Sequence, residues 1–155
     1  MLCPSRPPPG VTFYPAPIPL PQGEVTPAAL SEMLAGDELE RAARLLTAIE
    51  PALILFACTT GSLVHGPGWD RELIGRIERA TGIPATTTTT AVLAALRAVG
   101  ATSLTVATPY LDELNEIERD FFTGSGFTVA AIAGLHCPTD PAIGQLGPKD
   151  AVDLV

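Results

Sequence analysis

The chain has 155 residues, which is enough for one domain or for two small lobes that share a core. An apolar fraction of 46% and a charged fraction of 17% indicate a globular protein, and a net charge of −8 argues against nucleic-acid binding, which needs clustered Lys and Arg. No apolar run reaches the roughly 18 residues of a membrane span. We therefore expect no membrane contact. Cys3, Cys58 and Cys137 have neither the spacing of a disulfide framework nor that of a zinc site, so we expect no metal and a location in the reducing cytoplasm.

The N-terminal quarter of the chain predicts loops and two helices. Residues 1–24 are rich in proline, contain no secretory signal, and leave room for one short strand at 11–14. Thr26-Pro27 predicts a helix N-cap with proline at the first helical position, and this helix runs to Leu34. Asp37 with Glu40 resembles a capping box for a second helix that ends near Ile49.

Beyond Pro51, short apolar runs alternate with amphipathic segments. Such runs are typical of buried parallel strands, predicted at residues 52–57, 103–107 and 127–132. The helices between and after them are predicted at residues 70–80, 91–99 and 111–122, with another that begins at Pro148. A loop rich in Pro and Gly is predicted for residues 134–147. The alternation predicts an α/β fold with a largely parallel sheet.

A thiol and several hydroxyls follow the first of these strands. Cys58 comes directly after the strand and is followed by Thr59, Thr60, Gly61 and Ser62. Ligands bind beyond the carboxyl ends of parallel strands, and small residues let backbone N–H groups converge on an anion. The hydroxyls add donors, which would also favour the thiolate. The alternative is that Cys58 is an inert buried residue.

A second group of polar residues ends the next strand. Thr108 and Tyr110 lie there, and the Tyr110 phenol could donate to a substrate oxygen or transfer a proton, unless it only caps the sheet. The threonine tract 86–90 is interpreted mainly as β-branched filler with an N-cap, although its hydroxyls could line a pocket. Three isolated residues, His65, His136 and Cys137, are interpreted as solvated or inert, and Asn115 as structural. Four acidic residues are interpreted as a solvated helix face: Asp112, Glu113, Glu116 and Glu118.

Four segments in order resemble one enzyme family. They are Val25-Thr-Pro27, the cysteine loop Phe56-Ala-Cys58-Thr-Thr-Gly-Ser62, Thr81-Gly-Ile-Pro-Ala85 with the threonine tract and Ala91–Leu96, and Val106-Ala-Thr-Pro-Tyr110 continuing to Asn115. Together they are similar to the maleate cis-trans isomerase and arylmalonate decarboxylase branch of the aspartate/glutamate racemase superfamily. The similarity runs from about Val11 to Leu135.

This resemblance implies two α/β lobes with a parallel sheet and helices on both faces, and an active site between the lobes. Residues 1–88 would form the first lobe, with the cysteine loop at 58–62, and residues 89–155 the second. The family needs no metal, nucleotide or pyridoxal phosphate. Its members are commonly longer, so we expect the first strand and its substrate-binding loop before Met1, and the second catalytic cysteine beyond Val155.

The resemblance also implies roles for residues of this chain. Cys58 matches the first-lobe thiol, Thr59 and Thr60 match carboxylate-binding positions, and Tyr110 matches a donor to that carboxylate. Because the decarboxylases carry a small residue at the first position, a thiol there is similar to the isomerases and racemases. We therefore expect a cofactor-independent isomerase acting on a small dicarboxylate such as maleate, with a homodimer left open. The alternatives are an arylmalonate decarboxylase-like or racemase activity, or a non-catalytic carboxylate-binding fragment.

Overall fold

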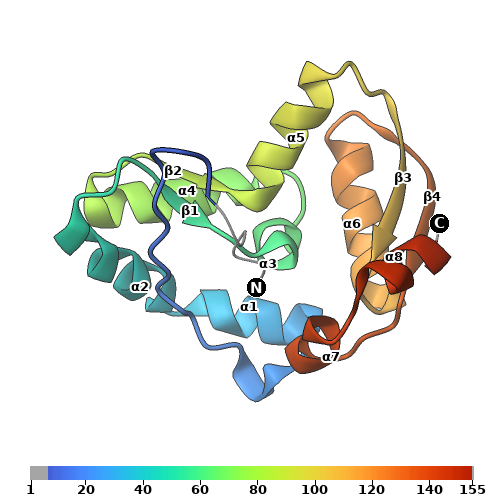
Figure 1. The fold of residues 1–155 in the computed structure, drawn as a ribbon, viewed down its shortest axis with the longest axis horizontal. Helices are drawn as coiled ribbons and strands as arrows, with labels where there is room; N and C mark the ends of the chain where they lie inside the picture. Colours follow the sequence, from blue (N-terminus) through green and yellow to red (C-terminus); the bar gives the residue numbers. More distant parts are fainter. Residues whose placement is uncertain (1–6, 155) are drawn as a thin grey trace.

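The computed structural model describes residues 7–154, in which strands and helices alternate as predicted (Figure 1). The predictions for residues 1–6, Cys3 included, lie outside the described residues. The helices are η1 (Pro21–Gly23), α1 (Pro27–Ala35), α2 (Glu38–Leu46), η2 (Thr47–Ile49), α3 (Thr59–Leu63), α4 (Trp69–Thr81), α5 (Thr88–Ala98), α6 (Asp112–Gly124), α7 (Asp140–Gly144) and α8 (Pro148–Leu154). The strands are β1 (Ile54–Phe56), β2 (Ala85–Thr87), β3 (Ser103–Thr108) and β4 (Thr128–Gly134).

The four strands form two separate parallel pairs. β1 pairs with β2 from Ile54 opposite Ala85 to Phe56 opposite Thr87. β3 pairs with β4 along its whole length, with a register irregularity between Leu104 and Thr105. In Figure 1 the first pair lies with α2 and α4 on one side of the molecule, and the second pair lies with α6 on the other. The α/β class with parallel strands is therefore confirmed.

Two hydrophobic clusters hold these elements together. The first gathers side chains from α1, α2, β1 and α4 and includes Leu114 of α6; the second joins Leu63 of α3 to Leu93, Phe121, Phe122 and Phe127. Because Leu63 of α3 belongs to the second cluster and Val64, directly after it, belongs to the first, the segment after Cys58 is anchored to both strand pairs. The predicted lobe boundary between residues 88 and 89 lies in the first turn of α5 and stays a prediction.

Several predicted details are wrong, each for a local reason. Residues 11–14 pair with no described strand and are exposed, so they form no strand. The expected capping box does not form: Asp37 does not have the extended backbone of a capping residue and makes no side-chain cap, and Glu40 is bonded to Arg76. β3 is not fully buried, since alternate residues face outward. The helix expected at residue 91 begins at Thr88, because Thr87 caps it through Thr90 N, and the loop 134–147 contains α7.

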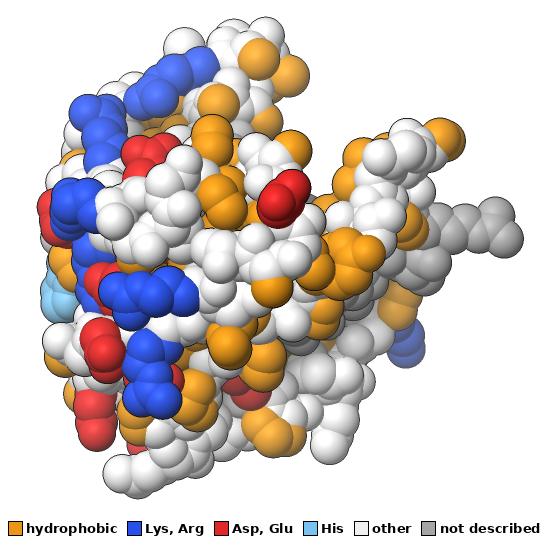
Figure 2. Space-filling view, turned by 90° about the vertical axis from the view of Figure 1, so that its left-hand side faces the viewer, with side chains coloured by type: hydrophobic (Ala, Val, Ile, Leu, Met, Phe, Trp, Pro, Cys, Tyr) orange, Lys and Arg blue, Asp and Glu red, His pale blue; other side chains and the backbone are white. Residues whose placement is uncertain are grey.

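The face formed by α2 and α4 carries positive and negative side chains next to one another (Figure 2). The Arg76 guanidinium donates to Glu40 Oε1 at 2.6 Å and to the carbonyls of Leu34 and Gly36, each at 2.7 Å. The hydrogen bond from Arg76 is the main reason why the pKa of Glu40 lies below its usual range. Arg76 thus fastens the α1–α2 corner to α4. Within residues 7–154, no helix combines the length and apolar character that crossing a membrane requires.

Candidate active site

Cys58 lies where β1 ends and α3 begins. Its backbone is extended, and its Sγ accepts a hydrogen bond from Gly61 N at 3.3 Å, so the sulfur itself caps the short helix. The Thr60 hydroxyl lies 3.9 Å from the same sulfur. A Cβ on Gly61 would stand 3.0 Å from Sγ and 3.2 Å from the Phe56 ring, so a larger residue would have to push the sulfur or the ring aside. The side chain is half-buried, and the thiol is not sealed in the core.

The protonation of Cys58 differs from the prediction. The donors Gly61 N–H and Thr60 O–H do favour the thiolate, as expected. Burial outweighs them, and Asp140 adds a negative charge, so the pKa of the Cys58 thiol is raised above its ordinary value. Cys58 is therefore a thiol at neutral pH, and the expected thiolate forms only when another group takes its proton.

Tyr110 reaches the same place from the second strand pair. It follows β3 by two residues and is packed against the first hydrophobic cluster, half-buried. Burial, together with the negative charges of Glu118 and of a Cys58 thiolate, raises the pKa of its phenol, while the neighbouring Thr60 hydroxyl lowers it. Thr60 thus links the phenol to the sulfur. With its pKa raised, Tyr110 is a neutral hydrogen-bond donor at physiological pH.

Thr108 and Asn115 fix the turn that carries Tyr110. The Thr108 hydroxyl donates to Asn115 Oδ1 at 2.5 Å and accepts from Tyr110 N at 3.2 Å. Gly134, at the end of β4, lies against this turn, because a Cβ there would come within 2.3 Å of the Tyr110 carbonyl oxygen. Thr108 is buried and its hydroxyl is used by these bonds, so its position favours holding the turn over the predicted substrate contact.

Ser62 and the threonine tract form a buried polar network behind Cys58. Ser62 is fully buried, donates to the Thr59 carbonyl at 2.9 Å and accepts from the Thr89 hydroxyl, and this favours a structural role over the predicted substrate contact. Thr87 caps α5, and Thr90 donates to the buried carboxylate of Asp70. The tract therefore holds α3, α4 and α5 together. Of the predicted donors, Thr59 is half-buried and Thr60 is buried beside the sulfur.

Comparison with known proteins places the chain in a family. The family model described as arylmalonate decarboxylase matches residues 8–155. The chain belongs to the arylmalonate decarboxylase family. Among curated relatives, it is 29% identical over 132 residues to the arylmalonate decarboxylase of Bordetella bronchiseptica, covering 85% of this chain and 54% of that protein.

Solved structures give the same relationship. The maleate isomerase Iso from Pseudomonas putida is 26% identical, with a TM-score of 0.77 over 83% of this chain and 53% of that one. A liganded double mutant of arylmalonate decarboxylase is 29% identical, with a TM-score of 0.81 over 88% of this chain and 56% of that one. The chain therefore spans about half the length of the relatives it matches. The predicted superfamily and fold are confirmed, and both enzymes occur among the relatives.

Glu118 is the residue of this family member that the sequence interpretation missed. Asp112, Glu113 and Glu116 are exposed as predicted, but Glu118 is only 5% exposed. Its Oε2 atom has no hydrogen-bond partner among the described residues, and burial raises the pKa of the carboxyl to about 7. The spacing contained the signal, because position 118 lies one helical turn from the apolar positions 114, 121 and 122.

The remaining polar candidates lie at the margin of the site. His65 stacks edge-on against Trp69, whose indole N–H donates to the Gly61 carbonyl at 3.0 Å and so braces the cysteine loop. His136 is exposed, 3.8 Å from Asp112. Among the described residues, the Cys137 thiol makes one hydrogen bond, donating to the Leu135 carbonyl at 3.8 Å. In residues 7–154 no group of three or more His, Cys, Asp or Glu could hold a metal ion.

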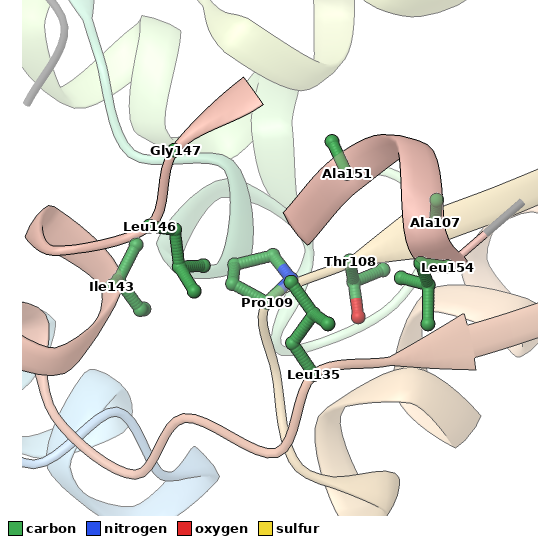
Figure 3. A pocket seen from close by; sticks show the side chains of 9 residues that line it. All are labelled: Ala107, Thr108, Pro109, Leu135, Ile143, Leu146, Gly147, Ala151 and Leu154. Carbon is green, nitrogen blue, oxygen red and sulfur yellow. The ribbon is translucent and has the colours of Figure 1, made fainter. Parts of the chain in front are cut away.

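An apolar pocket of about 240 Å³ lies beyond the carboxyl ends of β3 and β4 (Figure 3). Thr108 and Pro109 form one wall, and the side chains of α7, α8 and the segment between them form the other. Cys58 and Tyr110 do not line it, so the reactive groups are next to this pocket and not inside it. Pro109 connects the two, because it lies between the pocket residue Thr108 and Tyr110.

Proposed function

We propose that this chain forms the thiol-bearing, carboxylate-binding part of a maleate cis-trans isomerase-like enzyme, with Cys58 as the nucleophile. One observation carries the proposal: Cys58 from the end of β1 and Tyr110 from the end of β3 meet at the Thr60 hydroxyl, 3.9 Å from the sulfur. A nucleophile and two neutral oxygen donors are thereby gathered at one edge of the two strand pairs. This arrangement suits a small anion held beside a thiol.

The proposed reaction needs no net change in protons. The Cys58 thiolate adds to one carbon of the cis double bond, and the electron pair moves onto the neighbouring carboxylate as an enediolate. The central bond is then single and rotates. The enediolate collapses, the carbon–sulfur bond breaks, and the trans isomer leaves with the thiolate restored. Thr59, Thr60 and Tyr110 would donate to the enediolate oxygens, where charge accumulates.

The raised pKa of Cys58 places a condition on this mechanism. Since the resting group is a thiol, its proton must leave before addition, and the second cysteine that the resemblance implies would receive it. Support for covalent chemistry comes from a relative whose fold this chain shares: a Cys-to-Ser mutant of the Nocardia farcinica maleate cis-trans isomerase carries a covalently bound succinylcysteine intermediate. That protein has a TM-score of 0.80 to this chain.

Decarboxylation of an arylmalonate is the second candidate. The family model and the 29% identical relative favour it, and loss of carbon dioxide also produces an enediolate that the same donors would stabilise. A thiol at position 58 favours the isomerase, because the decarboxylases of this branch carry a small residue there. A cytoplasmic location and a homodimer stay predictions.

Product analysis separates these candidates. The complete gene product is incubated with maleate and, separately, with phenylmalonate, and proton NMR follows fumarate or phenylacetate. We expect fumarate, with activity abolished in Cys58→Ser and retained in Cys137→Ser, which removes a half-buried thiol that donates to the Leu135 carbonyl. Phenylacetate without fumarate would replace the isomerase with the decarboxylase. Binding of maleate without either product would indicate a carboxylate-binding protein.

A further inference from the structure

Glu118 is a buried carboxyl that the proposed mechanism does not use. It lies on the inner face of α6, between Leu114 and Phe121, both of which are fully buried. Its Oε2 atom has no partner among the described residues. Buried polar atoms are hydrogen-bonded in the great majority of cases, and an unpaired carboxyl at this depth costs stability. A group of this kind that lies next to a site is a candidate for function.

The neighbour that connects Glu118 to the site is Tyr110. Tyr110 packs against the first hydrophobic cluster, which includes Leu114, one helical turn before Glu118 on the same face of α6. Consistent with this placement, ionised Glu118 raises the pKa of the Tyr110 phenol. The phenol also lies beside Thr60, whose hydroxyl is 3.9 Å from the Cys58 sulfur. Cys58, Thr60, Tyr110 and Glu118 therefore form one series of polar groups with the phenol inside it.

Among residues 7–154, the charges around Glu118 include no cation that would neutralise it. The elements packed against α6 are α3 and β4, and neither carries a titratable side chain. Asp140 of α7 adds a further negative charge near Tyr110. Arg119 is adjacent in sequence, but its guanidinium donates to the Val129 carbonyl at 3.3 Å and lies 3.7 Å from Glu116. His136 pairs with Asp112 at the surface. An ionised Glu118 would thus stand as an uncompensated negative charge behind Tyr110.

We propose that Glu118 is a positioning residue for Tyr110. The Glu118 carboxylate takes up a proton from solvent when a dicarboxylate binds, and it releases the proton when the ligand leaves. The proposal rests on the proposed function, because it assumes that an anion binds on the far side of the phenol. When Glu118 is ionised, it attracts the phenol hydrogen and repels the ligand. When it is protonated, the repulsion is gone, and the Tyr110 O–H is free to donate to the ligand carboxylate.

Binding and protonation then affect each other equally, which fixes the expected pH profile. Since burial places the pKa of Glu118 near 7, dicarboxylate affinity falls as pH rises through that value. If only the protonated form binds, the affinity of the wild type falls by about 25-fold between roughly pH 6.5 and 8.5. In Glu118→Gln, which is permanently neutral and of the same shape, we expect a change below about twofold.

The first test needs no ligand and uses the two tyrosines of the chain, Tyr14 and Tyr110. The chain is labelled with 3-fluorotyrosine, and its fluorine NMR signals are followed over the same pH range, with Tyr14→Phe to assign them. We expect the Tyr110 signal to titrate with a midpoint near 7, and to lose this step in Glu118→Gln. If the titration of His65 or His136 shifts the signal, it does so equally in wild type and in Glu118→Gln. A Tyr110 signal that titrates identically in the two proteins overturns the coupling.

The second test measures the proton directly. Calorimetric titration of the complete gene product with succinate, a saturated dicarboxylate that cannot react, is repeated in buffers of different ionisation enthalpy at about pH 7.5. Wild type should take up most of one proton per succinate bound, Cys58→Ser should do the same, and Glu118→Gln should take up none. Succinate binding without proton uptake overturns the inference. If succinate does not bind at all, the proposed function fails, while the fluorine signals still decide whether Glu118 controls Tyr110.

Discussion

Replacing Glu118 with glutamine should change how the stability of the protein depends on pH. Burial raises the pKa of this carboxyl from 4.5 to about 7 in the folded chain. A carboxyl whose pKa is raised by folding is protonated in the folded state at pH values where the unfolded chain has already ionised it. Between these two values the folded state binds more protons, so the free energy of unfolding of the wild type decreases as pH rises.

The size of the effect follows from the same two values. A tenfold change in the proton equilibrium is worth about 1.4 kcal/mol, so the full cost of ionising Glu118 in place is on the order of 3 kcal/mol. Between about pH 5 and pH 8.5, the free energy of unfolding of the wild type should fall by roughly 2 to 3 kcal/mol for this reason. Glu118→Gln cannot ionise, and it should therefore gain that amount relative to wild type over this range.

Urea denaturation at five or six pH values measures this difference. The quantity to plot is the free energy of unfolding of Glu118→Gln minus that of wild type, because costs that do not depend on pH cancel from its slope. Glu116→Gln is the matched control: it lies on the same helix, its side chain is 68% exposed, and its difference from wild type should stay flat within about 0.5 kcal/mol. A flat line for Glu118→Gln would refute the assignment of a buried, raised carboxyl.

Three further predictions concern the neighbouring residues. Because the pKa of Cys58 is raised, its alkylation by iodoacetamide, followed by peptide mass spectrometry, should keep accelerating beyond about pH 9, and a plateau near neutral pH would contradict the burial argument. Gly134→Ala places a Cβ 2.3 Å from the Tyr110 carbonyl oxygen, so it should lower the free energy of unfolding in urea by about 2 kcal/mol or more and reduce turnover. Gly144→Ala is the control, because the space around that residue is open, and it should retain turnover. Arg76→Met leaves Glu40 unpaired and should lower the free energy of unfolding by about 3 kcal/mol in the same assay. The control Arg79→Met removes an exposed ion pair and should lower it by less than about 1 kcal/mol. Equal losses would show that the Arg76 contacts add no stability.

The local elements of this protein follow from its sequence because their causes are local. Thr26 and Pro27 begin α1 as predicted, since a hydroxyl cap and a fixed proline φ act within one turn. The apolar run before Cys58 predicted a strand, and the run of residues after it was expected to lie at a strand end. Cys58 and Tyr110 were each expected directly beyond a strand, where ligands bind in parallel sheets, and each lies there in the fold, although the two strands belong to separate pairs.

Tertiary packing decided what these residues can do. The sequence identified the donors around Cys58, but the depth at which the thiol is packed raises its pKa against them. Ser62 and Thr108 carry the hydroxyls expected of a binding site, yet partners distant in sequence, such as Thr89 from α5, occupy them. Charge type suggested that Glu118 is solvated, while the packing of α6 buries it. Desolvation and hydrogen-bond partners depend on which elements meet in space, and this information is not local to any segment of the sequence.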